Sequence, residues 1–238
     1  MYRHIEEDYA NVDQLLLDMG RLGERMLGQV TQALIRLDTD LALEVMRCDR
    51  EMDSLEKRID EECVGLVTRQ QPAARDLRFL VSAMKVGTDL ERIGDLAGNI
   101  ARAVREIAAT ASPSQLATTG DVAGALEELS QLAQAMVHDS LVALAGRDAH
   151  LARSVWERDD AVDSRYHELF QGLLTRMRER SDLAAQSFQW LIIGHSFERI
   201  ADHATNIAED VIYLVECKDI RHQATDYGDS LPAVSASA

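Results

Sequence analysis

The sequence predicts an all-α protein built as two tandem, pseudo-symmetric three-helix bundles. Three observations lead to this prediction: apolar residues recur every three or four positions over long stretches, only three prolines occur in 238 residues, and the pattern of the first half returns in the second. A three- and four-residue recurrence is the period of an amphipathic helix. The scarcity of helix breakers and an aromatic content of 5% disfavour a β-sandwich or barrel.

The first half is expected to contain three helices. Apolar positions at helical spacing cover residues 12–37 and stop at Asp38-Thr39-Asp40, a cluster typical of a turn and a helix cap. A second periodic stretch covers residues 41–66. The third follows Pro72, which suits the start of a helix, and extends to about residue 107.

The second half repeats this order after a segment rich in Ser, Thr, Pro and Gly. Periodic stretches over residues 126–144, 151–177 and 191–214 predict the fourth, fifth and sixth helices. The expected organisation is a first bundle over 5–109, a linker over 110–120, a second bundle over 121–217 and a flexible tail over 218–238.

Direct sequence identity between the halves indicates duplication of one unit. Residues 91–100 lie over residues 198–207 with seven of ten positions identical, at an offset of 107. The earlier helices match at an offset of 110, as Asp38 does with Asp148. The change of three residues falls between the second and third helices of each half, where a loop can absorb it.

Charge and composition exclude several classes of protein. The chain has 41 acidic and 25 basic residues, a formal net charge of −16, which disfavours binding to nucleic acid or anionic lipid and favours cations. Apolar runs are far too short for a membrane span, and the acidic N-terminus lacks an export signal, so a cytoplasmic protein without direct membrane insertion is expected. Cys48, Cys63 and Cys217 form neither a disulfide framework nor a thiolate site, and the first two are expected to be buried thiols.

Two matching stripes of oxygen-bearing side chains are the candidate functional feature. Positions i, i+4 and i+8 share one helix face, so each stripe carries a glutamate, an aspartate and an asparagine. Gly87 and Gly194 extend the stripes by one turn, which predicts that something approaches the backbone closely there. The stripes consist of Glu91, Asp95 and Asn99 in the first half and of Glu198, Asp202 and Asn206 in the second.

The second helix of each half adds two aspartates at the same spacing. These are Asp49 and Asp53 in the first half, and Asp159 and Asp163 in the second. Like charges one turn apart repel each other, and a bound cation removes that penalty. Carboxylate and amide oxygens suit Mg²⁺, Ca²⁺ or Mn²⁺, and carboxylate-rich helical sites also hold iron. Zinc is disfavoured because neither Cys nor paired His joins the stripes.

Simpler interpretations of these residues stay open. With 41 acidic residues, many four-residue spacings are simply solvated helix faces. Arg92 and Arg199 either orient the carboxylates or form surface ion pairs, and the second interpretation is favoured. His203 can be a ligand, but a capping or solvent-facing role is favoured.

Enzyme signatures are missing from the sequence. It contains no Gly-rich phosphate loop, no G-x-S-x-G elbow and none of the Glu-x-x-His pairs of ferritin-like di-iron proteins. The prediction is therefore a protein that is not an enzyme and needs no catalytic residues.

Two sequence motifs stand out: the first is Gln-Pro-Ala-Ala-Arg-Asp-Leu-Arg at 71–78, followed by Asp-Leu-Glu-Arg-Ile-Gly-Asp at 89–95, and the second covers residues 198–209. Both motifs resemble the PhoU family of bacterial phosphate-signalling regulators. The resemblance covers about residues 5 to 216 and implies two symmetric three-helix bundles, usually dimeric. It also implies polynuclear metal sites at E(D)xxxD motifs, which map onto Asp49, Asp53, Glu91 and Asp95, and onto Asp159, Asp163, Glu198 and Asp202. The metal is left open among Mg, Mn, Fe and Zn.

The resemblance also implies a function. The family exerts negative control on phosphate uptake and on the phosphate-starvation response, through contacts with the phosphate ABC transporter ATPase and a sensor histidine kinase. The resulting hypothesis is a metal-binding cytoplasmic adaptor that forms a homodimer. The alternatives are a ferritin-like carboxylate-metal oxidoreductase and a purely structural helical scaffold.

Overall fold

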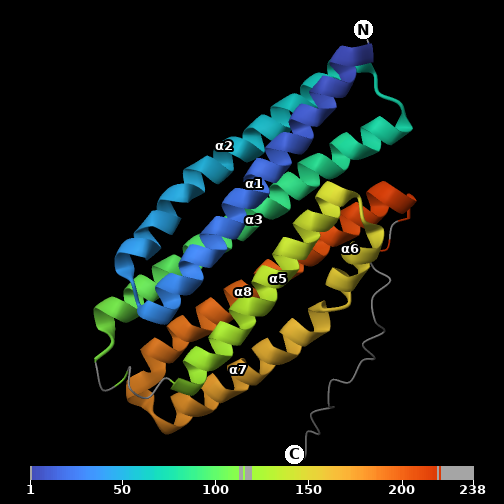
Figure 1. The fold of residues 1–238 in the computed structure, drawn as a ribbon. Helices are drawn as coiled ribbons and strands as arrows, with labels where there is room; N and C mark the ends of the chain where they lie inside the picture. The colour runs from blue at the N-terminus through green and yellow to red at the C-terminus, as the bar shows by residue number, and fades with distance from the viewer. Residues whose placement is uncertain (1, 113–114, 116–119, 219, 221–238) are drawn as a thin grey trace, which may run out of the picture.

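The computed structural model describes residues 2–112, 115, 120–218 and 220, and its regular structure in those residues is entirely helical (Figure 1). The first half forms α1 (Tyr2–Arg36), α2 (Thr39–Gln70) and α3 (Ala74–Thr110). The second half forms α5 (Gly120–Gly146), α6 (Ala149–Trp156), α7 (Asp159–Glu179), the 3₁₀ turn η1 (Ser181–Leu183) and α8 (Ala184–Glu216). The all-α, duplicated fold class is confirmed. Most of the predicted linker (113–114 and 116–119) and of the predicted tail (219 and 221–238) lies outside the described residues.

The predicted fifth helix is wrong as a single element, because the structure divides it into α6 and α7 at residues 157 and 158. Arg158 leaves the regular helical conformation (φ −90°, ψ −8°). Its guanidinium donates to Asp139 on α5 at 2.6 Å and to the carbonyl of Ser154 at 3.0 Å. α7 then begins with Asp159 and Asp160, and negative charge at this end of a helix stabilises it. The apolar period continues across this break, so the sequence pattern did not reveal it.

The two halves turn between their first and second helices in the same way. Leu37 and Arg147 both adopt φ 51°, in the left-handed region. The following aspartates then cap the next helix: Asp38 accepts from the backbone N–H groups of Asp40 and Leu41, and Asp148 accepts from the equivalent N–H groups in α6. The predicted cap at Asp38 is confirmed.

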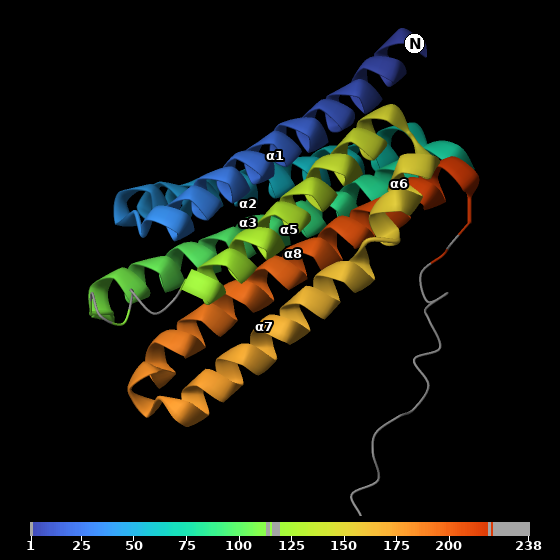
Figure 2. The same cartoon turned by 60° about the horizontal axis from the view of Figure 1, so that its bottom comes forward.

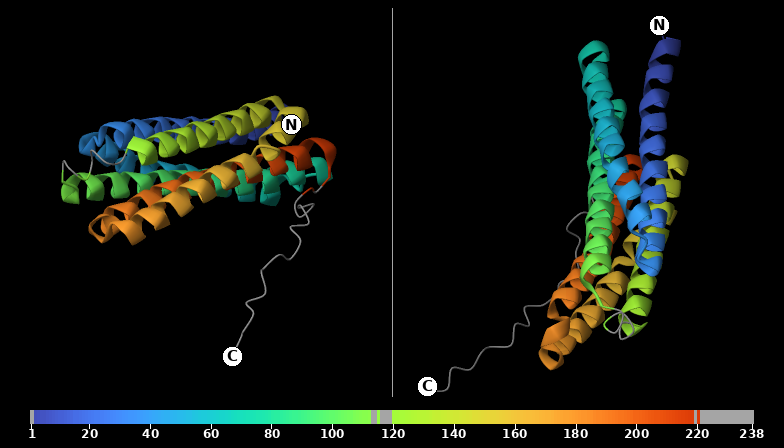
Figure 3. Two further views of the ribbon diagram at one scale, coloured as in Figure 1. Left: turned by 90° about the horizontal axis from the view of Figure 1, so that it is seen from below. Right: turned by 90° about the vertical axis from the view of Figure 1, so that its left-hand side faces the viewer.

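Apolar side chains fill the interior of both bundles, and α3 and α8 lie side by side where the bundles meet (Figures 1 and 2). Contacts pair early residues of α3 with late residues of α8, so the two helices are antiparallel: Nζ of Lys85 lies 3.5 Å from a carboxylate oxygen of Asp210, which is 4% exposed. The long helices run along a common direction, which gives the elongated outline of Figure 3. Within the described residues, no helix is long and apolar enough to cross a membrane.

Candidate metal centre

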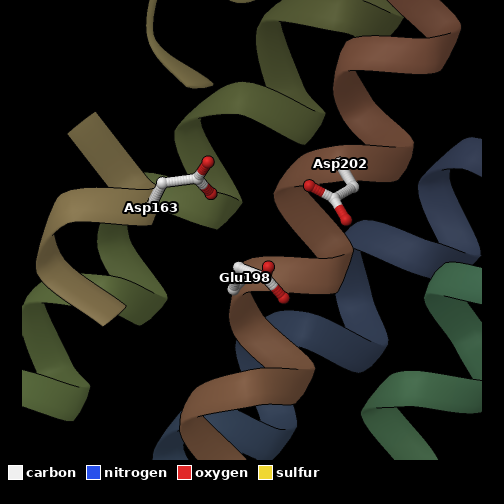
Figure 4. Close-up of side chains that lie close together, drawn as sticks. All are labelled: Asp163, Glu198 and Asp202. Carbon is white, nitrogen blue, oxygen red and sulfur yellow. The ribbon is translucent and has the colours of Figure 1, made fainter. Parts of the chain in front are cut away.

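Packing of α7 against α8 brings three of the predicted carboxylates together in the second half. Asp163 projects from α7, while Glu198 and Asp202 lie one turn apart on α8 (Figure 4). One oxygen from each of the three lies within 4.8 Å of the others. Among the described residues, these three form the one group of potential metal ligands whose donor atoms lie this near to one another. The two helices are antiparallel, so the pair of acidic residues four positions apart on α7 faces the similar pair on α8.

Burial and mutual repulsion act in the same direction on these carboxyl groups. Burial, followed by the charges of Glu198, Asp159 and Asp163, raises the pKa of Asp202 to about 7, against a weaker opposing effect of Arg199. Burial also raises the pKa values of Asp159, Asp163 and Glu198, and neighbouring carboxylates add to the rise. Holding all these groups ionised is therefore unfavourable unless a positive charge lies among them.

One oxygen of Glu198 is buried without a hydrogen bond from the described residues. This oxygen, Oε2, lies 3.1 Å from Nδ1 of His195, but the geometry is not that of a hydrogen bond. An unsatisfied buried carboxylate oxygen is costly. Together with the oxygen-only donor set, it fits a hard cation such as Mg²⁺ or Mn²⁺, or iron. Asp163, Glu198 and Asp202 are the residues that would hold the ion.

The fourth predicted carboxylate of this half, Asp159, lies beside the trio and not within it. Its carboxylate accepts a hydrogen bond from Oγ1 of Thr205 at 3.0 Å. A cleft of about 390 Å³ opens next to it, and its acidic lining includes three residues that the sequence analysis did not single out. The acidic residues of this cleft are Glu157, Asp159, Asp160, Asp202 and Glu209.

In the first half, α2 and α3 bring the corresponding carboxylates together in a more open arrangement. Asp49 lies against Asp95, and burial followed by the charge of Asp95 raises the pKa of Asp49. Burial followed by Asp95 also raises the pKa of Glu91, with Asp53 contributing to both shifts. Within the described residues these groups do not form a trio as close as that of the second half. The two predicted sites are thus similar in composition and unequal in geometry.

The arginines that follow the two glutamates contact the stripes from exposed positions. Arg92 lies 3.5 Å from a carboxylate oxygen of Glu91 and 3.4 Å from one of Asp95, and Nε of Arg199 lies 3.5 Å from Asp202. Both guanidinium side chains are about half exposed, at 56% and 49%. These are solvent-screened ion pairs, which contribute little to stability.

The two predicted asparagine ligands have other partners. Asn99 accepts a hydrogen bond from Arg102. Asn206 donates from Nδ2 to Oδ1 of Asp89, on α3 of the other bundle, at 3.2 Å. Their role as metal ligands stays a prediction, and in Asn206 the nitrogen of the amide is already committed to the bundle interface.

The favoured interpretation of His203 as a capping or solvent-facing residue is wrong. Its side chain is only 11% exposed, and Nδ1 lies 2.8 Å from Oδ1 of Asp89. Asp89 therefore joins two residues of α8 to α3. The sequence analysis missed Asp89 because it lies off the repeated stripe and aligns with Ser196 in the other half.

The two stripe glycines admit neighbouring apolar side chains. A Cβ on Gly194 would lie 2.6 Å from Cδ2 of Leu169, so the predicted close approach is confirmed there, with α7 as its source. At Gly87 the nearest atoms, from Ile59, are 3.6 Å away, an ordinary contact distance. The close approach predicted at Gly87 is therefore wrong.

Fold and site together define a class: duplicated all-α proteins with a carboxylate-lined helical face in each half. The family model described as "PhoU domain" matches twice, over residues 16–104 and 126–211. The chain belongs to the PhoU family.

Individual relatives agree along most of the chain. The "Phosphate-specific transport system accessory protein PhoU homolog" of Pseudomonas aeruginosa is 39% identical, covering 92% of this chain and 90% of its own length. The protein of the same description from Pseudomonas putida is 40% identical, covering 92% of this chain and 85% of its own length. The crystal structure of PhoU from Pseudomonas aeruginosa matches with a TM-score of 0.85 at 37% identity, covering 90% of this chain and 99% of that one. The crystal structure of the phosphate transport system regulatory protein PhoU from Streptococcus pneumoniae matches with a TM-score of 0.79 at 26% identity. This match covers 90% of this chain and 98% of that one.

Proposed function

We propose that this protein is a phosphate transport accessory protein that acts as a metal-binding negative regulator of phosphate uptake and of phosphate-starvation signalling. It works in the cytoplasm as a homodimeric adaptor between the phosphate ABC transporter ATPase and a sensor histidine kinase, without catalysis. The accessory role is supported by the descriptions of relatives that match over most of the chain. The metal-binding part is supported by the trio Asp163, Glu198 and Asp202.

The single observation that carries the metal proposal is the convergence of Asp163, Glu198 and Asp202, whose oxygens lie within 4.8 Å of one another, beside an unsatisfied buried oxygen of Glu198. A divalent cation would neutralise the trio and satisfy that oxygen at once. The ion would tie α7 to α8, and a second ion would tie α2 to α3. The metal-bearing faces would then hold the bundles in a fixed shape and present a surface to partner proteins.

Equilibrium dialysis with Mn²⁺, Fe²⁺ and Mg²⁺ tests the metal sites. We expect a Glu198→Ala, Asp202→Ala variant to lose the tighter-bound fraction of metal, because its closest ligands are gone. A Glu91→Ala, Asp95→Ala variant should lose the weaker fraction. The control is Asp60→Ala, Glu61→Ala, an exposed acidic pair on α2, which should bind metal as the unchanged protein does. Unchanged metal content in a variant with all four site substitutions would contradict the proposal.

Co-purification with the transporter ATPase, from cells grown in high and in low phosphate, tests the adaptor role. We expect association that differs between the two conditions, since a regulator of uptake must respond to phosphate supply. Absence of association in both conditions would contradict the adaptor role while leaving the metal sites intact. Catalytic turnover of peroxide by an iron-loaded sample would instead support the oxidoreductase alternative.

A further inference from the structure

A cleft of about 600 Å³ lies at the end of the molecule where α3 begins, α8 ends and α5 turns into α6. These segments meet at the right of Figure 1. Three arginines line the cleft, Arg75, Arg78 and Arg147, in a chain that as a whole has 16 more acidic than basic residues. The acidic lining consists of Asp13 and Asp76, so the cleft keeps a surplus of positive charge.

Arg147 is held in place from two sides and has hydrogen-bonding capacity to spare. Its Nη2 donates to Asp13 at 2.6 Å, and its guanidinium carbon lies 5.0 Å from the centre of the Phe79 ring. Its Nη1 is buried and has no hydrogen-bond partner in the described part of the chain. The guanidinium is therefore fixed by stacking and one ion pair, and one of its donors stays unused.

Arg78 and Arg75 face the cleft without carboxylate partners. The guanidinium of Arg78 lies 5.5 Å from the centre of the Tyr213 ring, and its Nη1 lies 2.7 Å from Sγ of Cys217. Across the described residues, no carboxylate oxygen lies within 4.0 Å of a guanidinium nitrogen of either arginine, the limit for an ion pair. The residue before α3, Ala73, gives that helix no side-chain cap. The N–H groups of its first turn therefore add partial positive charge at the same place.

The duplicated half shows that the fold does not need these arginines. At the offsets that align the two halves, Arg147 corresponds to Leu37, Arg75 to Asp182 and Arg78 to Ala185. Leu37 adopts the same left-handed turn as Arg147, with φ 51° in both. The same architecture is thus built without a single guanidinium at these places, so the basic cleft belongs to one end of the molecule only.

We propose that this cleft binds the phosphoryl group of a small anionic molecule. Three guanidinium forks, two from α3 and one from the turn between α5 and α6, offer more donors than the two oxygens of one carboxylate can use, whereas a phosphoryl group has three strong acceptor oxygens. Guanidinium groups match phosphate geometry in a bidentate manner. The volume lies in the range of small-molecule sites and leaves room beyond the phosphoryl group.

The cleft is separate from the candidate metal centre. Leu214, which lines the cleft, lies twelve positions after Asp202, and this corresponds to about 18 Å along α8. The inference therefore stands independently of the metal sites, and its test uses metal-free protein.

Isothermal titration calorimetry of the full chain in chelator, at low ionic strength, tests the proposal. The titrants are pyrophosphate, ATP and, as a carboxylate comparison, citrate. We expect at least one of the two phosphoryl compounds to bind and citrate to bind at least about tenfold more weakly. Arg147→Leu and Arg75→Asp, the residues that the other half already carries, should each weaken binding by about tenfold or more. Arg75 is exposed, so its variant keeps the fold even if Arg147→Leu does not.

Two control variants separate this site from other sources of binding. Arg58→Ala removes an exposed arginine of α2 and should change the affinity by less than about twofold. The Glu198→Ala, Asp202→Ala variant should bind the phosphoryl compound as the unchanged protein does. The proposal is overturned by absence of binding for both phosphoryl compounds at millimolar concentration, by equal binding of citrate, or by unchanged affinity in the Arg75→Asp variant.

Discussion

At Asp202, the environment of one side chain changes what its carboxyl group can do. The group is 40% exposed, yet burial of the rest and three neighbouring carboxylates raise its pKa from its usual value of 3.8 to about 7. In the metal-free protein it is half protonated near neutral pH. A cation competes with that proton, so metal binding is expected to strengthen as the pH rises.

The same shift predicts how stability depends on pH in the metal-free protein. Between about pH 4 and pH 7 the folded state binds more protons at Asp202 than the unfolded state does, so the free energy of unfolding falls as the pH rises through this window. Asp202→Asn cannot ionise and should reduce the fall. After allowance for solvent screening at a partly exposed group, we expect it to stabilise the protein by about 1 kcal/mol at pH 8.

Urea unfolding in chelator at pH 5.5 and pH 8 measures this effect. Asp60→Asn, at an exposed position of α2, is the control and should leave the difference between the two pH values unchanged. An Asp202→Asn variant with the same pH difference as the unchanged protein would show that this carboxyl group does not titrate near neutrality.

At the scale of single elements, local sequence signals were reliable where the interaction itself is local. The cap at Asp38 needs only N–H groups two and three residues further on, and it forms as predicted. The division between α6 and α7 was missed because it depends on Asp139, nineteen residues away on α5, which holds Arg158. A helix break of this kind leaves no mark on the apolar period.

Loss of the cap on α2 gives a prediction at this scale. Asp38→Ala should lower the free energy of unfolding by about 1 kcal/mol, because two N–H groups of the first turn lose their acceptor. The neighbouring Thr39→Ala, at an exposed position, should change it by less than about 0.5 kcal/mol. Chemical denaturation of the two variants makes the comparison, and equal losses would argue against a capping role.

At the scale of the whole molecule, polar contacts tie the two bundles together beside the candidate metal centre. Asp89 on α3 accepts from Asn206 and contacts His203, and both lie next to or on the stripe that contains Asp202. Lys85 and Asp210 add a second contact between α3 and α8. The relative position of the bundles is thus fixed through residues adjacent to the predicted ligands.

Removing this contact should loosen the joint between the bundles. Asp89→Ala leaves the buried His203 without its partner and should destabilise the protein by about 1–3 kcal/mol. Asp89→Asn retains an acceptor oxygen and should cost less. Thermal unfolding ranks the variants, and hydrogen exchange should show faster opening of α3 and α8 in Asp89→Ala. Equal stability of Asp89→Ala and the unchanged protein would contradict a joining role for Asp89.

The sequence by itself determined the all-α class, the duplication, the acidic stripes and the resemblance to the PhoU family, because helical period and repetition are written along the chain. It also named the carboxylates that the structure brings together. Only the tertiary structure decided which of them lie closest, that Asp89 pairs with His203, that α6 and α7 are separate, and that three arginines meet in one cleft. The physical reason is that these features are contacts between helices distant in the chain. Their distances depend on how the bundles pack, which no local pattern of residues records.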